Sequence, residues 1–228
     1  DRWDGPCPRR SAPRVVSDAL RTIERIAREH GIDWALVGGQ ALVAHGVPRD
    51  TLDADALVDR DKLGTLAHAL CDAGWQALVY EASTREFRVV AAPTTHYFDD
   101  PVLFDCGQER ATVPLRSPDG LDVDLIAAQH TVEVEMVATA TPLRLYEVSI
   151  PVAPLGGVML VKAKAARLKD VAALEQSAEH LSGRVTDAAV AWARRRDPST
   201  AEDLDAILRT AQARKIPKRT EPTGRGGG

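Results

Sequence analysis

The apolar residues of this chain change their spacing repeatedly up to about residue 150 and keep a helical spacing afterwards. Between residues 14 and 30 they recur on one face of a helix, which predicts an amphipathic helix that ends at Gly31. The pattern that follows predicts, in order, a strand over 34–37, a brief helix over 40–45, a strand over 51–58 and a helix over 62–73.

Further strands are predicted over 75–80, 86–91, 112–116, 121–126 and 143–150. The turn Ser117-Pro118-Asp119-Gly120 predicts a hairpin between the third and fourth of them. Four helices are then expected over 155–166, 171–181, 185–195 and 201–214. The sequence thus predicts an α+β fold with a mixed α/β core over 14–150, a helical lobe over 155–215 and flexible termini at 1–13 and 216–228.

Composition narrows the class of protein only slightly. The chain has 228 residues, of which 44% are hydrophobic and 27% charged, as in an ordinary globular protein. The net charge of −4 does not mark a general nucleic-acid binder. Three cysteines without a Cys-x-x-Cys pair predict reduced thiols and a cytoplasmic location. No run of 18 apolar residues occurs, so no membrane partner is expected.

Two aspartates on one predicted strand are the first candidates for chemistry. Side chains two residues apart on a strand share a face, so Asp53 and Asp55 point the same way. Two such carboxylates repel each other unless a cation lies between them, and Mg²⁺ binds through carboxylates together with substrate phosphates. The pair indicates a site for Mg²⁺ (or Mn²⁺). The simpler alternative is an exposed strand edge.

A third carboxylate is expected on the strand 121–126, where Asp122 and Asp124 share a face. If this strand lies beside the first acidic strand, one of them completes a set of three acids suited to two-metal phosphoryl displacement. We favour Asp124, because it directly precedes the apolar pair Leu125-Ile126, whereas Asp122 lies nearer the turn.

Two consecutive glycines, Gly38 and Gly39, separate the first strand from the brief helix. Glycine lets the backbone adopt positive φ and approach a ligand closely, and the free amides of a helix start favour an anion. A triphosphate could therefore bind between this turn and the paired aspartates. For the two glycines taken alone, a tight strand-to-helix connection without a ligand is the better explanation.

The stretch from Val37 to Val58 resembles the opening motif of the DNA polymerase β-like nucleotidyltransferase superfamily. The resemblance is to the minimal bacterial branch, which includes the abortive-infection toxins of toxin–antitoxin systems, with antibiotic nucleotidyltransferases as more distant relatives. It implies a nucleotidyltransferase-type mixed β-sheet flanked by helices and followed by a helical lobe. The residues that carry it are Gly38-Gly39-Gln40-Ala41-Leu42, His45-Gly46, Arg49, Thr51 and Asp53-Ala54-Asp55.

The resemblance also implies roles for single residues. Asp53, Asp55 and Asp124 are expected to be the catalytic, metal-binding acids, with Asp124 activating the acceptor hydroxyl. The residues expected to bind the nucleotide in the core are Gly38, Gly39, Gln40 and Thr51. Gln40 departs from the family, which commonly has a small hydroxyl residue there, although its amide could still donate to a phosphate.

A lysine-rich stretch opens the helical lobe. Helical spacing over 158–170 places Lys162, Ala166 and Lys169 on one face. In the toxin-like branch a Lys in this helix and a following Lys/Arg-Asp pair recur, and Lys162 with Lys169-Asp170 resembles that feature. Lys162 and Lys169 are therefore further candidates for nucleotide binding, with an ordinary solvated helix face as the alternative.

The combined pattern predicts a metal-dependent enzyme that transfers NMP from an NTP, such as ATP, to a hydroxyl acceptor. The acceptor is open: RNA such as tRNA, or a protein, would suit a toxin that has an antitoxin partner. An antibiotic acceptor is an alternative. A non-catalytic interaction module that keeps the fold is another.

Overall fold

The protein divides into two compact units, residues 1–158 and 159–228. The computed structural model describes residues 12–51, 53–81, 86–89 and 112–215. None of the helices in these ranges combines the length and the apolar content that a membrane span requires. The last two residues of the strand predicted over 86–91, and nearly all residues of the two predicted flexible termini, lie outside the described residues.

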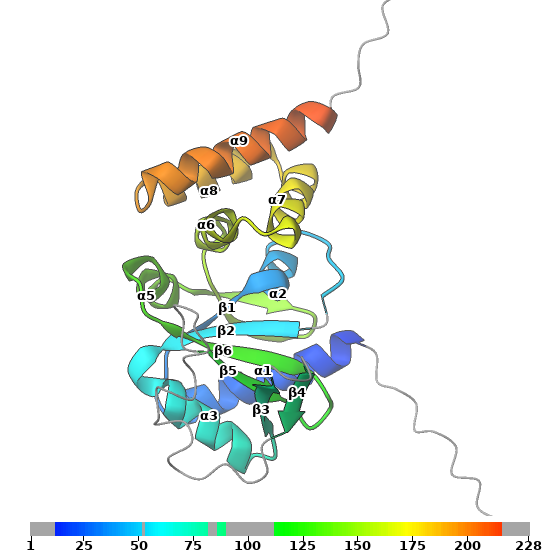
Figure 1. The fold of residues 1–228 in the computed structure, drawn as a ribbon, viewed down its shortest axis with the longest axis vertical. Coiled ribbons are helices and arrows are strands. Elements are labelled where there is room, and N and C mark those ends of the chain that lie inside the picture. Colours follow the sequence, from blue (N-terminus) through cyan, green and yellow to red (C-terminus); the bar gives the residue numbers. More distant parts are fainter. Residues whose placement is uncertain (1–11, 52, 82–85, 90–111, 216–228) are drawn as a thin grey trace, which may run out of the picture. The chain divides into compact units, whose positions relative to one another are not determined.

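One mixed sheet organises the first unit (Figure 1). Its described strands are β1 (Trp34–Val37), β2 (Asp53–Asp59), β3 (Gln76–Glu81), β4 (Glu86–Val89), β5 (Thr112–Arg116), β6 (Asp122–Ala128), β7 (Thr141–Leu145) and β8 (Val148–Val152). They lie in the order β4-β3-β5-β6-β2-β1-β8-β7. The pairs β2–β6 and β1–β8 are parallel and the other described pairs are antiparallel.

Helices α1 (Ala12–Glu29) and α3 (Leu63–Asp72) contact each other and lie along one face of this sheet (Figure 1). A 3₁₀ turn over Arg60–Lys62 leads into α3. The apolar faces of both helices are buried, with Leu20, Ile23, Leu66 and Leu70 all at 0% exposure. Since burial of such side chains is the main favourable term in folding, this layer is the core of the unit.

The central strands alternate between buried apolar and more exposed polar positions. On β6, Val123 and Leu125 are buried while Asp122 and Asp124 are half-buried. On β2, Ala54 and Ala56 are buried in the same way. Because successive side chains on a strand point to opposite faces, the apolar residues turn the acidic positions to the other face of the sheet.

Two short helices contact the central strands: α2 (Gly38–Ala44) and α5 (Thr131–Ala138) both touch β1 and β2. The sequence pattern does not predict α5, because Val132, Val134 and Met136 follow the two-residue period of a strand. Buried Glu133 stabilises the helix start instead. Its carboxylate accepts hydrogen bonds from the backbone N–H groups of Gln129 and His130, at 3.0 and 3.2 Å.

The strand predicted over 143–150 is wrong, because this region forms the hairpin of β7 and β8. Tyr146 and Glu147 connect the paired residues Leu145 and Val148. The turn has no Gly, Asn or Pro to announce it. Tyr146 instead adopts a φ of 52°, in the left-handed region that bulky residues such as tyrosine rarely occupy.

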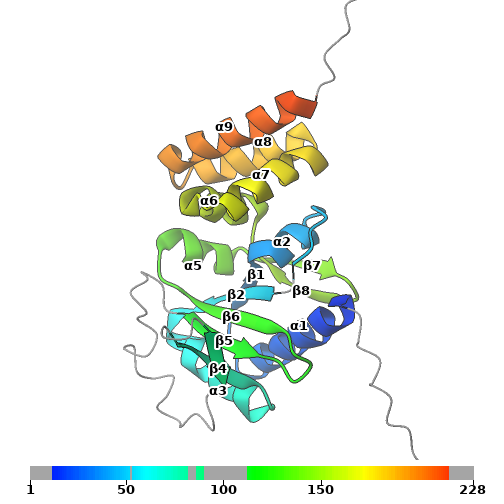
Figure 2. The same cartoon turned by 45° about the vertical axis from the view of Figure 1, so that its right-hand side comes forward.

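The second unit is helical, as predicted. Its helices are α6 (Leu155–Ala165), which begins just before the division, α7 (Leu168–His180), α8 (Gly183–Arg194) and α9 (Pro198–Lys215). Helix α9 packs against α7 and α8 (Figure 2). The predicted common face of Lys162, Ala166 and Lys169 is wrong, because Ala166 has a φ of 50° and separates α6 from α7.

Candidate functional site

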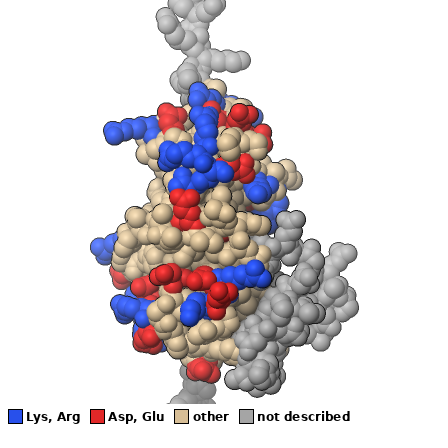
Figure 3. All heavy atoms as spheres, turned by 90° about the vertical axis from the view of Figure 1, so that its left-hand side faces the viewer, with Lys and Arg blue, Asp and Glu red and all other residues tan. Residues whose placement is uncertain are grey.

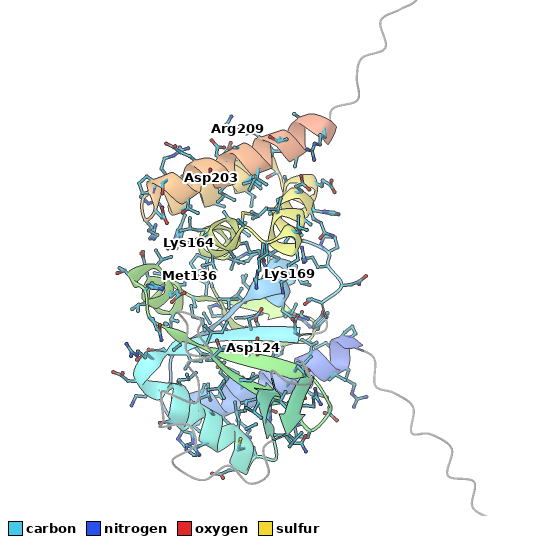
Figure 4. The ribbon with its side chains drawn as sticks, in the orientation of Figure 1. Asp124, Met136, Lys164, Lys169, Asp203 and Arg209 are labelled. Atoms are coloured by element: carbon cyan, nitrogen blue, oxygen red, sulfur yellow. The ribbon has the colours of Figure 1, made fainter. Side chains whose placement is uncertain are left out.

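The acidic positions of β2 and β6 lie side by side, which meets the condition that the sequence set for a third acid. In the parallel pairing of these strands Asp53 is opposite Asp122 and Asp55 is opposite Asp124. Figure 4 marks Asp124 on the central sheet. Neighbouring strands are about 4.8 Å apart and paired residues face the same side, so the four aspartates occupy one patch of the sheet.

Of the two glycines, Gly38 lies directly against this patch and Gly39 lies against Thr51. Gly38 has a φ of 68°, and a Cβ atom built on it would lie 1.7 Å from Asp55 Oδ2. A Cβ atom on Gly39 would lie 2.9 Å from Thr51 Oγ1. The absence of side chains at these two positions therefore lets Asp55 and Thr51 approach the backbone at the start of α2.

A hydrogen bond links Thr51 to the first acid. The Thr51 hydroxyl donates to Asp53 Oδ1, and Asp53 itself is exposed.

Gln40, by contrast, is 0% exposed. Its side-chain Nε2 donates to the carbonyl of Thr51 at 3.1 Å, and its Oε1 accepts from the Tyr146 hydroxyl at 3.3 Å. The predicted contact of this amide with a phosphate would thus compete with two hydrogen bonds inside the protein.

Asp122 has a partner that the sequence analysis missed. Arg116 donates from Nε and Nη2 to its two carboxylate oxygens, at 2.6 and 3.0 Å. Arg116 is directly opposite Asp122 in the β5–β6 hairpin, so counting the register from the Pro118-Asp119-Gly120 turn would have found it. The two-pronged pair gives Asp122 a structural role, which is consistent with our preference for Asp124.

The donor atoms suit a hard cation. Within the described parts of the chain, no three Asp, Glu, His or Cys side chains are grouped so that they could hold a metal ion as they stand. Asp53 is turned to Thr51 and Asp55 lies over Gly38. Mg²⁺, however, is commonly bound by one or two carboxylates, with waters and substrate phosphates completing its shell, so these residues fit a metal that binds together with a nucleotide.

The lysine candidates belong to the helical unit. Lys162 Nζ lies 3.2 Å from Oδ1 of Asp170, whose side chain is only 1% exposed, while Lys169 is exposed. Arg167 Nε donates to Asp170 Oδ2 at 2.6 Å. Burial by itself would raise the pKa of Asp170, but the hydrogen bond from Arg167 and the charge of Lys162 outweigh it, so the pKa is lowered.

This architecture matches solved structures. The crystal structure of ANT(2″)-Ia in complex with adenylyl-2″-tobramycin aligns over 88% of this chain and 99% of that one, with a TM-score of 0.50 and 11% identity. A candidate nucleotidyltransferase from Thermotoga maritima aligns over 72% and 92%, with a TM-score of 0.47 and 14% identity. A nucleotidyltransferase-like protein from Paracoccidioides brasiliensis aligns over 86% and 92%, with a TM-score of 0.43 and 16% identity.

No protein-family profile and no curated protein sequence matches the chain. At these low identities the likeness defines the fold, and the protein has the nucleotidyltransferase fold that the motif over 37–58 predicts. The α+β class with a C-terminal helical part is confirmed.

The close approach of Asp55 to Gly38 gives a first test. We expect Gly38→Ala to lower the free energy of unfolding by about 1–2 kcal/mol for the left-handed backbone and by about 1–3 kcal/mol more for the displaced carboxylate. Gly46→Ala is the matched control, because Gly46 has a φ of 92° and nothing within 4 Å of an added Cβ. Urea unfolding of both variants measures the difference. Equal losses would show that the Asp55 carboxylate does not occupy this space.

The buried ion pair gives a second test. A lowered pKa in the folded state stabilises the protein above the unfolded-state pKa of Asp170, and that contribution is lost as the pH falls through the folded-state value. Asp170→Asn should therefore lower the unfolding free energy by roughly 3 kcal/mol at pH 7, and the difference from wild type should shrink below about pH 4.

Asp205→Asn is the control for this test. Asp205 pairs with Arg209 and Arg194, whose side chains are 71% and 55% exposed, so its loss should change the unfolding free energy by less than about 1 kcal/mol. Denaturant unfolding at several pH values separates the two variants. A loss in Asp170→Asn that is the same at pH 3 and pH 7 would contradict the prediction.

Proposed function

We propose that this protein is a metal-dependent nucleotidyltransferase that transfers NMP from an NTP to a hydroxyl group. The observation that carries the proposal is the parallel pairing of β2 and β6. It sets Asp53, Asp55 and Asp124 on one patch of the sheet, next to Gly38 and Gly39. A nucleotidyltransferase fold and three carboxylates beside a close-approach glycine turn together support phosphoryl chemistry.

In the proposed reaction the acceptor hydroxyl attacks the α-phosphorus in line with the leaving pyrophosphate. A new P–O bond forms to the acceptor, the bond to the bridging oxygen breaks, and the hydroxyl proton passes to the carboxylate of Asp124. Asp53 and Asp55 would hold Mg²⁺ (or Mn²⁺), which supplies positive charge to the phosphates when bound. The backbone at Gly38 and Gly39 would lie against the triphosphate.

Lys162 and Lys169 stay predictions as phosphate-binding residues. If Lys162 contacts the γ-phosphate, Asp170 would act as the group that orients its ammonium, because the carboxylate is buried and already bonded to it. Lys169 is exposed. The ion pairs described for Asp170 are with Lys162 and Arg167. Both lysines act here only as sources of positive charge.

The acids give a third prediction. Calorimetry with ATP or GTP and Mg²⁺ should show binding that weakens strongly in Asp53→Ala and Asp55→Ala. Asp124→Asn should reduce transfer of a labelled nucleotide by roughly 100-fold or more, because it removes the proton acceptor. Asp122→Asn is the matched control and should retain transfer, since Asp122 is bound to Arg116. Unchanged Mg²⁺-dependent nucleotide binding in both alanine variants would show that these two aspartates do not form the metal site.

For the acceptor we propose RNA, on the basis of how charge is divided between the units. Residues 1–158 contain 24 Asp and Glu against 15 Lys and Arg, a net charge of −9. Residues 159–228 contain 14 Lys and Arg against 9 Asp and Glu, a net charge of +5. Lys and Arg side chains gather on the face of the helical unit that Figure 3 shows. A basic unit attracts a polyanion, largely through its phosphates.

Two exposed arginines allow this acceptor to be tested: Arg184 in the first turn of α8 and Arg195, the C-cap residue of that helix. Arg184 and Arg195 are eleven positions apart, close to three helical turns, so they face the same way. We expect Arg184→Glu/Arg195→Glu to raise the KM for RNA several-fold and to flatten its dependence on salt, without changing Mg²⁺-dependent NTP binding. Transfer of each labelled NTP to total RNA, followed across salt concentrations, measures both effects.

Arg14→Glu, which changes an exposed arginine of α1, is the control with the same change of side chain in the acidic unit. Label transfer to an aminoglycoside instead of RNA would overturn the RNA proposal in favour of the antibiotic alternative. The net charge of −9 on the sheet unit favours that alternative, because it suits a cationic drug. Label in protein extract would indicate a protein acceptor. A toxin role with an antitoxin partner stays a prediction.

A further inference from the structure

A chain of hydrogen bonds joins the β7–β8 turn to the first candidate metal ligand. The Tyr146 hydroxyl donates to Gln40 Oε1, and Gln40 Nε2 donates to the Thr51 carbonyl. The Thr51 hydroxyl in turn donates to Asp53 Oδ1. The first of these contacts connects residues 106 positions apart in the sequence, so it exists only because of the tertiary fold.

The outer end of this chain is a strained turn. Tyr146 adopts a φ of 52° in the two-residue connection between Leu145 and Val148. Glycine would adopt this backbone without strain, whereas a tyrosine is held there only when its surroundings over-determine it. The hydrogen bond from its hydroxyl to buried Gln40 is such a restraint. The turn thus retains an unfavourable residue whose side chain reaches toward the site.

In the middle of this series of hydrogen bonds, Thr51 is restrained from two sides. Gln40 is 0% exposed, so its amide needs partners within the protein, and it has one at each end. The amide fixes the Thr51 carbonyl, while Gly39 leaves room for the Thr51 side chain, whose Oγ1 would lie 2.9 Å from a Cβ at that position. With its carbonyl and its side chain both restrained, Thr51 directs its hydroxyl to Asp53.

We propose that Gln40 and Tyr146 are positioning residues for Asp53. They hold Thr51 so that its hydroxyl orients the Asp53 carboxylate for the metal ion. This inference rests on the proposed function, because it assigns Asp53 to a metal. It differs from direct phosphate binding by Gln40, since here the amide acts through Thr51. Groups that orient a metal ligand through hydrogen bonds typically change metal affinity when removed.

The test measures the Mg²⁺ dependence of the full chain in three variants. Tyr146→Phe keeps the ring and removes the hydroxyl. Gln40→Met removes the amide at similar volume. Tyr146→Gly relieves the turn strain while removing the same hydrogen bond. In each variant we expect the Mg²⁺ concentration for half-maximal NMP transfer to rise about fivefold or more, the factor that corresponds to one lost hydrogen bond. The same increase is expected in the Mg²⁺ needed for ATP to raise Tm.

Two comparisons separate positioning from a general loss of stability. Tyr146→Gly should have an unchanged or higher Tm without ligand, yet show the same Mg²⁺ defect as Tyr146→Phe. Trp34→Phe also removes a side-chain hydrogen bond from the sheet unit, the 2.9 Å bond from Trp34 Nε1 to Glu24, but at the opposite end of β1 from Gly38. It should lower Tm and leave the Mg²⁺ dependence unchanged.

The double variant Gln40→Met/Tyr146→Phe should need no more Mg²⁺ for half-maximal transfer than Gln40→Met alone, because both changes interrupt the same series of hydrogen bonds. Wild-type Mg²⁺ dependence in Tyr146→Phe and Gln40→Met, with transfer intact, would overturn this inference and leave the proposed function standing. Additive effects in the double variant would also overturn it. A wild-type protein that shows neither Mg²⁺-dependent ATP binding nor transfer would instead overturn the proposed function, and this inference with it.

Discussion

The parallel pairing of β2 and β6 is the constraint on which the candidate site depends. Each strand carries an Asp-x-Asp, and the register sets Asp53 opposite Asp122 and Asp55 opposite Asp124. A shift of one residue in either strand would turn its carboxylates to the apolar face. Val123, at 1% exposure, fixes the register, because it packs in the core only when the neighbouring aspartates face the other way. The apolar core thus positions the acids.

The same close packing explains why two glycines precede α2. Gly38 gives space to the carboxylate of Asp55, and Gly39 gives space to Thr51. The glycines are therefore needed by the protein itself, before any ligand is considered. A structural need and a role in phosphate binding are compatible, since the backbone that a carboxylate can approach is also open to an anionic ligand when a cation offsets the charge.

Charge is distributed unevenly along the chain, and the two units have net charges of opposite sign. The sheet unit collects acids, with a net charge of −9, and the helical unit has a net charge of +5. The whole-chain value of −4 conceals this division. Within the helical unit, the buried acid Asp170 binds Lys162 and Arg167, which links α6 to the start of α7. That ion pair follows the break at Ala166, which also separates Lys162 from Lys169, so the predicted common helix face of these residues does not form.

The sequence by itself determined the elements whose signals are local: the amphipathic helices, the Asp-x-Asp strands and the glycines that match a nucleotidyltransferase motif. It did not reveal the β7–β8 hairpin, because Tyr146 occupies a left-handed turn position that normally carries glycine. Nor did it assign Gln40, whose partners Thr51 and Tyr146 lie 11 and 106 residues away. Only the tertiary structure decided these features, because a buried polar group is defined by the partners that folding brings to it, and spacing along the chain does not record them.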